Sequence, residues 1–182
     1  MNTEHENISS AEMSISVLEL LRVAHEYCIF VENADQKSPQ EIFDFFRKLG
    51  PLLYLKGALL PDVVPDFPEA DERFVTEEEW QAVFNEFRSR LLNIDEYWHI
   101  DHENGVEYEA IKASLSENFT DIYQDLKDFL LLYQKNTRDA RQNAVHNNRM
   151  LFETRWGIKI LENLRYIHFL LNRERIESDE EF

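Results

Sequence analysis

The apolar residues of this chain recur mainly three and four positions apart, which is the spacing of one helix face, and seldom alternate as they do in strands. The pattern predicts helices at about residues 11–31, after residue 38, after residue 76, and over residues 114–135 and 137–173. The sequence therefore indicates an all-α fold, a single-domain bundle of five to six helices.

Three of the expected helices begin with a capping box, in which a Ser or Thr is followed three residues later by Glu. These boxes are Ser38 to Glu41, Thr76 to Glu79 and Ser114 to Glu117. Pro39 also suits the first position of its helix, because a proline there loses no intrahelical hydrogen bond. Pro51, by contrast, follows Gly50 inside the second helix and is expected to break or kink it.

Two stretches do not show a helical period. Residues 61–72 contain three of the five prolines and are expected to form a long surface connection, with Phe67 and the nearby Phe74 as exposed contact points. Residues 95–110 carry a turn signal at Asn104 and Gly105 between two apolar runs, which indicates a short hairpin. We expect residues 1–10 to be a flexible N-terminus, residues 11–175 one helical domain, and residues 176–182 an acidic tail.

The helix expected at 114–135 separates apolar from acidic residues. Its apolar residues fall within an arc of about 120° at 100° per residue, and its acids gather on the opposite side. The acids are Glu117, Asp121, Asp125 and Asp128. Glu117 is explained as part of a cap and Asp128 as solvated. For Asp121 and Asp125 two interpretations stay open: a solvated helix face, or a pair that meets a cation on a neighbouring helix.

The last helix offers such cations. Arg149 and Glu153 fall inside its apolar stripe, where charged residues are seldom buried without a partner. They can pair with each other, or Arg149 or Arg155 can reach an acid on another helix. His168 lies at the stripe's edge, where a hydrogen-bonded core histidine is commoner than a ligand. The candidate polar cluster comprises Asp121, Asp125, Arg149, Glu153, Arg155, Trp156 and His168.

The charge of the chain restricts its partners. The net charge is −17, which argues against binding nucleic acid or anionic membranes. Residues 66–109 hold 14 acids and 3 bases, whereas residues 138–175 hold 8 bases and 4 acids. These segments can complement each other within the fold or across a homodimer. No apolar run approaches the roughly 20 residues of a membrane span. The N-terminus is acidic, unlike a signal peptide, so we expect a cytoplasmic protein.

Signatures of catalysis are missing from the sequence. The single cysteine, Cys28, lies in an apolar run and is expected to be a buried, inert thiol. His99, Asp101, His102 and Glu103 have the composition of metal ligands, but in a strand His102 would point away from His99 and Asp101. We therefore assign no catalytic residue, cofactor or metal ligand.

Four segments resemble the bacterial domain of unknown function 5063 family. They are Leu53–Pro61, Glu72–Trp80, Ser114–Phe129 and Phe152–His168. The resemblance implies an all-helical fold and supplies no activity, ligand or partner. It places Asp121, Asp125, Asp128, Trp156, Gly157, Arg165 and His168 at motif positions.

Two functions of different classes follow from these observations. The favoured one is a non-enzymatic protein-interaction or self-associating module, because apolar residues are abundant and chemical signatures are not. The alternative is a small-ligand-binding or hydrolytic bundle with a polar pocket between residues 114–135 and 137–173. The direction of the Asp121 and Asp125 side chains distinguishes them, since the second function requires both to face inward.

Overall fold

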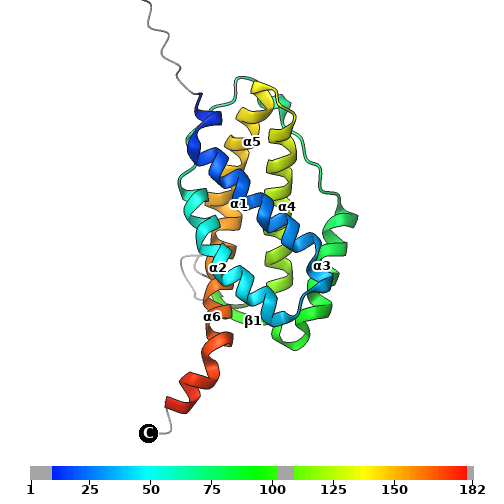
Figure 1. Cartoon of the computed structure of the whole chain (residues 1–182), viewed down its shortest axis with the longest axis vertical. Helices are drawn as coiled ribbons and strands as arrows, with labels where there is room; N and C mark the ends of the chain where they lie inside the picture. The colour runs from blue at the N-terminus through cyan, green and yellow to red at the C-terminus, as the bar shows by residue number, and fades with distance from the viewer. Residues whose placement is uncertain (1–9, 102–108, 180–182) are drawn as a thin grey trace, which may run out of the picture.

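The structure of the protein is a computed structural model, which describes the backbone of residues 10–101 and 109–179 and the side chains of residues 10–99 and 110–173. It confirms the all-α fold with a small hairpin (Figure 1). The α-helices are α1 (Ile15–Glu32), α2 (Pro39–Ala58), α3 (Glu77–Leu91), α4 (Leu115–Gln134), α5 (Arg138–Leu151) and α6 (Gly157–Asp179). Strands β1 (Glu96–Asp101) and β2 (Glu109–Ser114) form an antiparallel pair.

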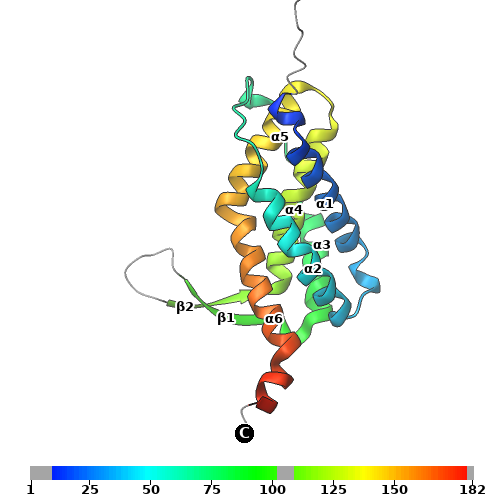
Figure 2. The same ribbon diagram turned by 60° about the vertical axis from the view of Figure 1, so that its left-hand side comes forward.

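Helix α4 is the central element of the bundle. It packs against α1, α3, α5 and α6, and the two views of the ribbon show these helices on different sides of it (Figures 1 and 2). Phe119 from α4 lies 4.9 Å from the ring of Phe46 and 5.1 Å from the ring of Phe87. Its carbonyl accepts a hydrogen bond from the buried Tyr27 hydroxyl. A helix surrounded in this way has little surface left for solvent.

The capping signals act as expected at two helices. Ser38 and Thr76 each accept from the backbone N–H three residues later, and the glutamate there reaches back to the capping residue. At α4, the Ser114 hydroxyl accepts from the N–H of Glu117, as predicted, and donates to Asp95. The third cap therefore ties the helix to the start of the hairpin.

The expected break at Pro51 is wrong. Helix α2 continues through this residue to Ala58, and Pro51 lies on its exposed side. A proline ring costs least where it faces solvent, and the buried side chains of Phe46 and Leu53 hold both halves of the helix on the core. Packing thus outweighs the lost backbone hydrogen bond.

The single helix expected over 137–173 is divided by a π-helical turn at Phe152–Trp156. The N–H of Gly157 donates to the carbonyl of Phe152, five residues earlier. A π turn contains one residue more than an α turn, so the helix phase shifts at this point. A wheel drawn at constant 100° therefore cannot place residues correctly on both sides of the turn.

The connection between α2 and α3 runs over the surface and contains a short 3₁₀ turn at Pro68–Ala70. Phe67 is exposed as expected, but Phe74 is partly buried, with the Lys135 ammonium 5.4 Å from its ring centre. The prediction of Phe74 as an exposed contact point is therefore wrong.

Helix α6 reaches Asp179 and takes in the first residues of the expected acidic tail. The expected flexible N-terminus, except Ser10, and residues 180–182 lie outside the described residues.

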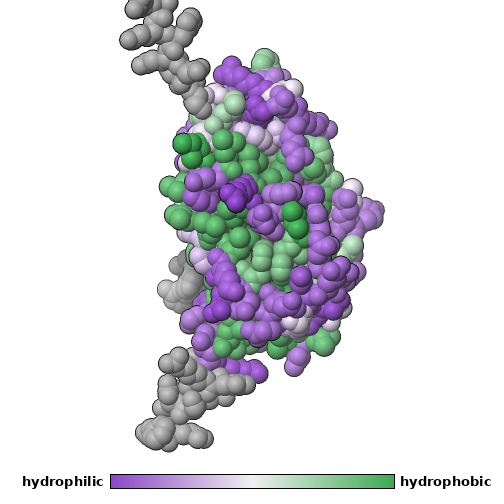
Figure 3. Space-filling view, viewed as in Figure 1, coloured by the Kyte–Doolittle hydropathy of each residue, from purple (hydrophilic) through white to green (hydrophobic). Residues whose placement is uncertain are grey.

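The surface of the bundle exposes apolar side chains. The face of the molecule seen in Figure 3 shows hydrophobic residues among hydrophilic ones. The exposed aliphatic side chains of α1 and α2 include Ile15, Leu18, Leu55 and Leu59. Cys28 is buried as predicted, and burial raises the pKa of its thiol to about 12.

Within the described residues, no helix has the length and apolar character to cross a membrane.

Candidate functional site

The aspartates of α4 face the interior. Asp121, Asp125 and Asp128 are only 8%, 1% and 5% exposed, so the interpretation of a solvated acidic face is wrong. The physical reason is the position of α4, since a helix packed on several sides must bury its polar residues too. Buried carboxylates require partners, and these come from four other parts of the chain: the π turn, α6, α3 and the connection before α3.

Asp121 and Asp125 share a cation from the π turn. Arg155 lies 3.1 Å from Asp121 Oδ1 and 3.2 Å from Asp125 Oδ1. Asp121 also pairs with Lys159 of α6 at 3.0 Å and accepts from the indole N–H of Trp80 at 2.9 Å. The π turn, within the segment expected as the last helix, thus brings an arginine to Asp121 and Asp125 on α4. This is one of the two arrangements that the sequence left open.

Asp128 attaches the surface connection to α4. Its Oδ1 accepts from the backbone N–H groups of Phe74 and Val75 at 2.8 and 2.9 Å, and its Oδ2 pairs with Arg73 at 3.0 Å. The same guanidinium lies 3.6 Å from Asp125 Oδ1. The prediction of a solvated Asp128 is therefore wrong, because the carboxylate satisfies backbone donors that would otherwise be unpaired.

The other members of the predicted cluster lie elsewhere. Arg149 and Glu153 pair with each other at 3.1 Å, and the side chain of Glu153 is 56% exposed. Trp156 is fully buried and donates to the carbonyl of Asn148, whereas His168 is exposed on α6. Of the alternatives left open for Arg149 and Glu153, the pair with each other is the one that forms. Their expected burial inside the core stripe is wrong, and His168, expected at the stripe's edge as a hydrogen-bonded core histidine, is exposed. The phase shift at the π turn explains why the helical wheel placed Arg149 and Glu153 inside the apolar stripe.

Sequence reasoning missed Arg73, Trp80, Lys159 and Asn148. Trp80 carried a signal, because a buried indole N–H usually has an acceptor. No sequence signal pointed to Arg73, because the connection has no helical or strand period from which the direction of a side chain could be inferred. Asn148 lies just before the π turn, on the part of α5 that faces α4.

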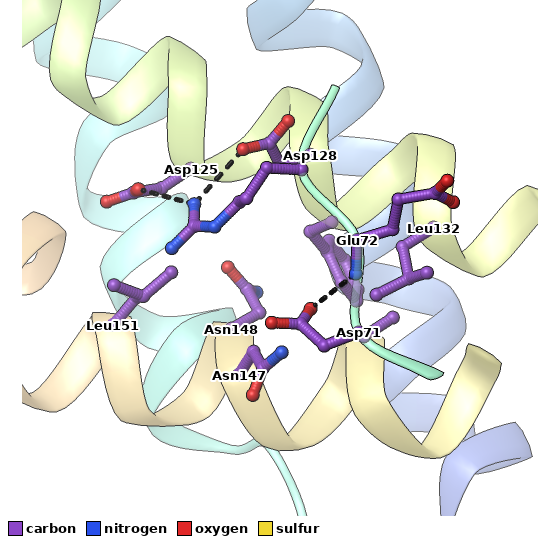
Figure 4. A pocket seen from close by; sticks show the side chains of 11 residues that line it. Asp71, Glu72, Asp125, Asp128, Leu132, Asn147, Asn148 and Leu151 are labelled. Atoms are coloured by element: carbon purple, nitrogen blue, oxygen red, sulfur yellow. Dashed lines mark hydrogen bonds and ion pairs between the residues drawn. The ribbon is translucent and has the colours of Figure 1, made fainter. Parts of the chain in front are cut away.

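A small pocket lies beside Asp125, between α4, α5 and connection residues 71–73. Figure 4 shows Asp125 and Asp128 on one side of it and Asn147 and Asn148 on the other. The space inside it that a water-sized molecule can reach is about 20 Å³. Asp125 Oδ2 and both polar side-chain atoms of Asn148 are buried without a hydrogen-bond partner among the described residues.

The burial of Asp125 alters its acidity. Desolvation raises the pKa of this carboxyl from its usual 3.8 to about 6, against the opposing effect of Arg155 and Arg73. The neighbouring charge of Asp121 acts in the same direction as desolvation. The carboxyl therefore titrates close to neutral pH.

The free energy of unfolding is expected to depend on pH through Asp125. Between about pH 4 and 6 the folded protein keeps a proton that the unfolded chain has released, so stability falls as pH rises. A pKa raised from 3.8 to about 6 corresponds to about 3 kcal/mol. In urea unfolding at pH 4 to 7.5, the stability of the wild type minus that of Asp125→Asn should fall by most of this amount, because the carboxyl of the unfolded chain is already partly ionised at pH 4. A difference that stays constant with pH would contradict it.

A larger groove lies along β1. Nine residues line it: Glu96, Tyr97, Trp98, His99, Ile158, Glu162, Arg165, Tyr166 and Phe169. Its volume is about 600 Å³, and Trp98 and Phe169 are 69% and 51% exposed. Exposed aromatic residues beside an arginine are typical of protein-binding surfaces.

Side chains from one face of β1 attach the hairpin to α6. The ring of Tyr97 stacks on that of Tyr166 at 4.4 Å, and His99 Nδ1 lies 3.5 Å from Glu162 Oε1. His99 is one of the four residues between 99 and 103 that have the composition of metal ligands. Asp101's side chain, His102 and Glu103 lie outside the described side chains, and within the described part no group of three His, Cys, Asp or Glu residues is arranged to hold a metal.

Comparison with known proteins places the chain in a family. The family model "Domain of unknown function (DUF5063)" matches residues 11–173. The chain belongs to this family. Its fold is similar to the crystal structure of protein BF1032 from Bacteroides fragilis, with a TM-score of 0.77 and 30% sequence identity over 88% of this chain and 94% of that one. No curated protein matches the chain.

Family membership confirms the resemblance seen in four sequence segments and brings no established function. Of the motif positions named from that resemblance, Asp121, Asp125, Asp128 and Trp156 are buried around the π turn and α4. Arg165 instead lies in the groove along β1. Gly157 lies at the end of the π turn and His168 is exposed on α6, so the motif residues do not form one site.

Proposed function

We propose that the protein is a non-enzymatic interaction module that binds an extended polypeptide segment along the free edge of β1. The observation that carries this proposal is the set of groove residues. Four consecutive residues of β1 line the groove, and among the described side chains of β2, residues 110–114, none does. Because consecutive strand residues point to opposite faces, a groove that touches all four runs along the strand's edge.

The backbone of β1 has the free groups that strand addition requires. The Leu115 N–H donates to the Asp95 carbonyl, which places Asp95 and Leu115 in a hydrogen-bonded pair. Because such pairs alternate along an antiparallel ladder, Tyr97 and His99 bond to β2, while the N–H and C=O groups of Glu96 and Trp98 point away from it. A polypeptide in the groove would gain these backbone hydrogen bonds, as in other cases of β-augmentation.

The side chains around this edge define the chemistry of the partner. Ile158, Tyr166 and Phe169 of α6 offer apolar contacts beneath the edge. Glu96 pairs with Arg88 and Lys112, and Glu162 with His99, but Arg165 has no ion pair within the described side chains. We therefore expect an extended partner with apolar or aromatic side chains and one carboxylate opposite Arg165.

Selection of random linear peptides displayed on phage tests this function. Peptides that alternate apolar and polar residues and carry an acid should be enriched on the immobilised protein. Trp98→Ala and Arg165→Ala should each weaken binding of the selected peptides by about 30-fold in fluorescence anisotropy, because buried aromatic and arginine contacts dominate such interfaces.

Two matched variants serve as controls. Ile111→Ala changes an exposed residue of β2 outside the groove, and Arg47→Ala removes an exposed arginine of α2. Both should bind like the wild type. Peptides that bind Trp98→Ala and Arg165→Ala with unchanged affinity would contradict the proposal. If sedimentation equilibrium instead shows a dimer that Trp98→Ala dissociates, the occupant of the groove is a second copy of this chain.

A further inference from the structure

Residues 64–75 of the connection between α2 and α3 lie over α5 and α4 as a strap without a fully buried side chain. Val64 and Phe67 are 79% and 53% exposed, and Phe74 and Val75 are partly buried. Segments with few buried apolar contacts open locally with free energies far below that of global unfolding. We therefore expect the strap to open more easily than the helices beneath it.

Polar contacts hold the two ends of the strap to different helices. At α5, the Asp66 N–H donates to Gln142 Oε1 at 3.1 Å, and Gln142 Nε2 donates to Asp66 Oδ2 at 3.2 Å. At α4, Asp128 accepts from the last two backbone N–H groups of the strap and pairs with Arg73 at 3.0 Å. Water replaces such partners when the strap opens, so each contact contributes little net free energy to the closed state.

The α4 end of the strap covers Asp125. Residues 71–73 close one side of the small pocket that Asp125 and Asn148 line, as the close-up in Figure 4 shows. Asp125 is 1% exposed, and the space of about 20 Å³ beside it has room for about one water. An open strap would place bulk water where the closed strap leaves this confined space.

The charged groups around Asp125 decide which state its ionisation favours. Arg155 of the π turn lies 3.2 Å from Asp125 Oδ1, and Arg73 of the strap lies 3.6 Å from it. The side chain of Arg73 is 50% exposed, so solvent weakens its attraction for the carboxylate. The remaining groups around this site are Asp121 and Asp128 of α4, Lys159 of α6 through its pair with Asp121, Asp71 and Glu72 of the strap, and the uncharged Asn147 and Asn148 of α5.

We infer that the strap opens as a unit from α4 and α5, and that ionisation of Asp125 favours the open state. Opening hydrates the carboxylate and removes Arg73, whereas Arg155 lies in the π turn and remains beside it. The strap is separate from the groove along β1, and its opening does not depend on the binding of a polypeptide there.

The sign of the pH dependence follows from the cause of the raised pKa. Burial is the largest effect on the Asp125 carboxyl and raises its pKa to about 6, so hydration returns the pKa towards its usual 3.8. Opening therefore releases a proton. The open population should rise with pH between about pH 4 and 6 and become constant above this range.

Hydrogen exchange of the full-length, ¹⁵N-labelled protein, measured by NMR at pH 5 to 7.5, tests the inference. The amides of Asp66, Phe74 and Val75 report the strap, and the amide of the buried Leu126 in α4 reports global unfolding. After division by the intrinsic exchange rates, the strap amides should give a larger opening constant than Leu126 at every pH. This constant should rise about tenfold from pH 5 to 7.5, as expected when the pKa moves from about 6 to 3.8 on opening.

Variants connect the opening to Asp125 and Arg73. Asp125→Asn should abolish the pH dependence, whereas Glu153→Gln makes the same chemical change on an exposed carboxylate outside the pocket and should retain it. Arg73→Ala should raise the opening constant about fivefold, as expected for the loss of a half-exposed ion pair. Arg47→Ala removes an exposed arginine of α2 and should leave the constant unchanged.

Three results would overturn the inference. They are strap amides that exchange no faster than Leu126, an opening constant that does not change between pH 5 and 7.5, and an unchanged constant in Arg73→Ala. If Asp125→Asn does not fold, the pH profile of the wild type and the Arg73→Ala variant still decide the matter.

Discussion

Replacement of Asp95 by alanine is expected to lower the free energy of unfolding by about 4 kcal/mol. Asp95 is fully buried where α3 is followed by β1. Its carboxylate accepts from Arg88, from the hydroxyls of Ser114 and Ser116, and from the backbone N–H of Ser116. Alanine removes all of these acceptors at once and leaves a buried backbone donor and two hydroxyls without their partner.

Glu96 provides the control for this prediction. It follows Asp95 directly and also pairs with Arg88, but its side chain is 37% exposed. Glu96→Ala should therefore change stability far less than Asp95→Ala when both are measured by urea unfolding. If the two variants lost equal stability, the carboxylate of Asp95 would not hold the hairpin to α4.

Replacement of Gly157 by alanine is the second large effect, a loss of about 3 kcal/mol. A Cβ atom at this position would overlap the carbonyl oxygen of Phe152 and lie within 3.0 Å of its ring. The oxygen belongs to the backbone of the π turn and cannot move unless the turn changes. The turn also carries Arg155, so its distortion would disturb the ion pairs with Asp121 and Asp125.

Thr154→Ala is the matched control for Gly157→Ala. Thr154 lies in the same π turn and is exposed, so its replacement should change stability by no more than about 0.5 kcal/mol. Thermal or urea unfolding of both variants compares them directly. A Gly157→Ala protein as stable as Thr154→Ala would show that the π turn does not require glycine.

Much of the fold could be predicted because local signals and packing agree. The caps at Ser38 and Thr76 and the apolar face of α4 are properties of single helices, and the structure confirms them. The hairpin followed from its turn signal. The break at Pro51 was predicted wrongly because a local preference was outweighed by tertiary contacts that no single segment reveals.

The buried charge network could be predicted only in part. The sequence showed that Asp121 and Asp125 can point together, and that Arg155 lies near the apolar edge of its helix. It could not show that α4 is surrounded, that a π turn shifts the phase after Leu151, or that Arg73 folds back from an irregular connection. These features depend on contacts between segments far apart in the chain.

The groove along β1 was not foreseen. Its residues come from a short strand and from α6, and neither segment carries a binding motif. The exposure of Trp98, and Arg165 without an ion pair among the described side chains, acquire meaning only when the hairpin is placed against α6. Sequence reasoning did favour an interaction module, but it located the contacts at Phe67 and Phe74 of the Pro-rich connection, and of these two only Phe67 is exposed.

Amide hydrogen exchange along β1, with and without a selected peptide, tests the central claim most directly. In the free protein, the Tyr97 and His99 amides should exchange slowly because they bond to β2, whereas those of Glu96 and Trp98 should exchange quickly. Peptide binding should slow the exchange of Glu96 and Trp98 specifically, because their N–H groups gain acceptors on the added strand. Peptide binding that leaves the exchange of Glu96 and Trp98 unchanged would contradict strand addition at β1.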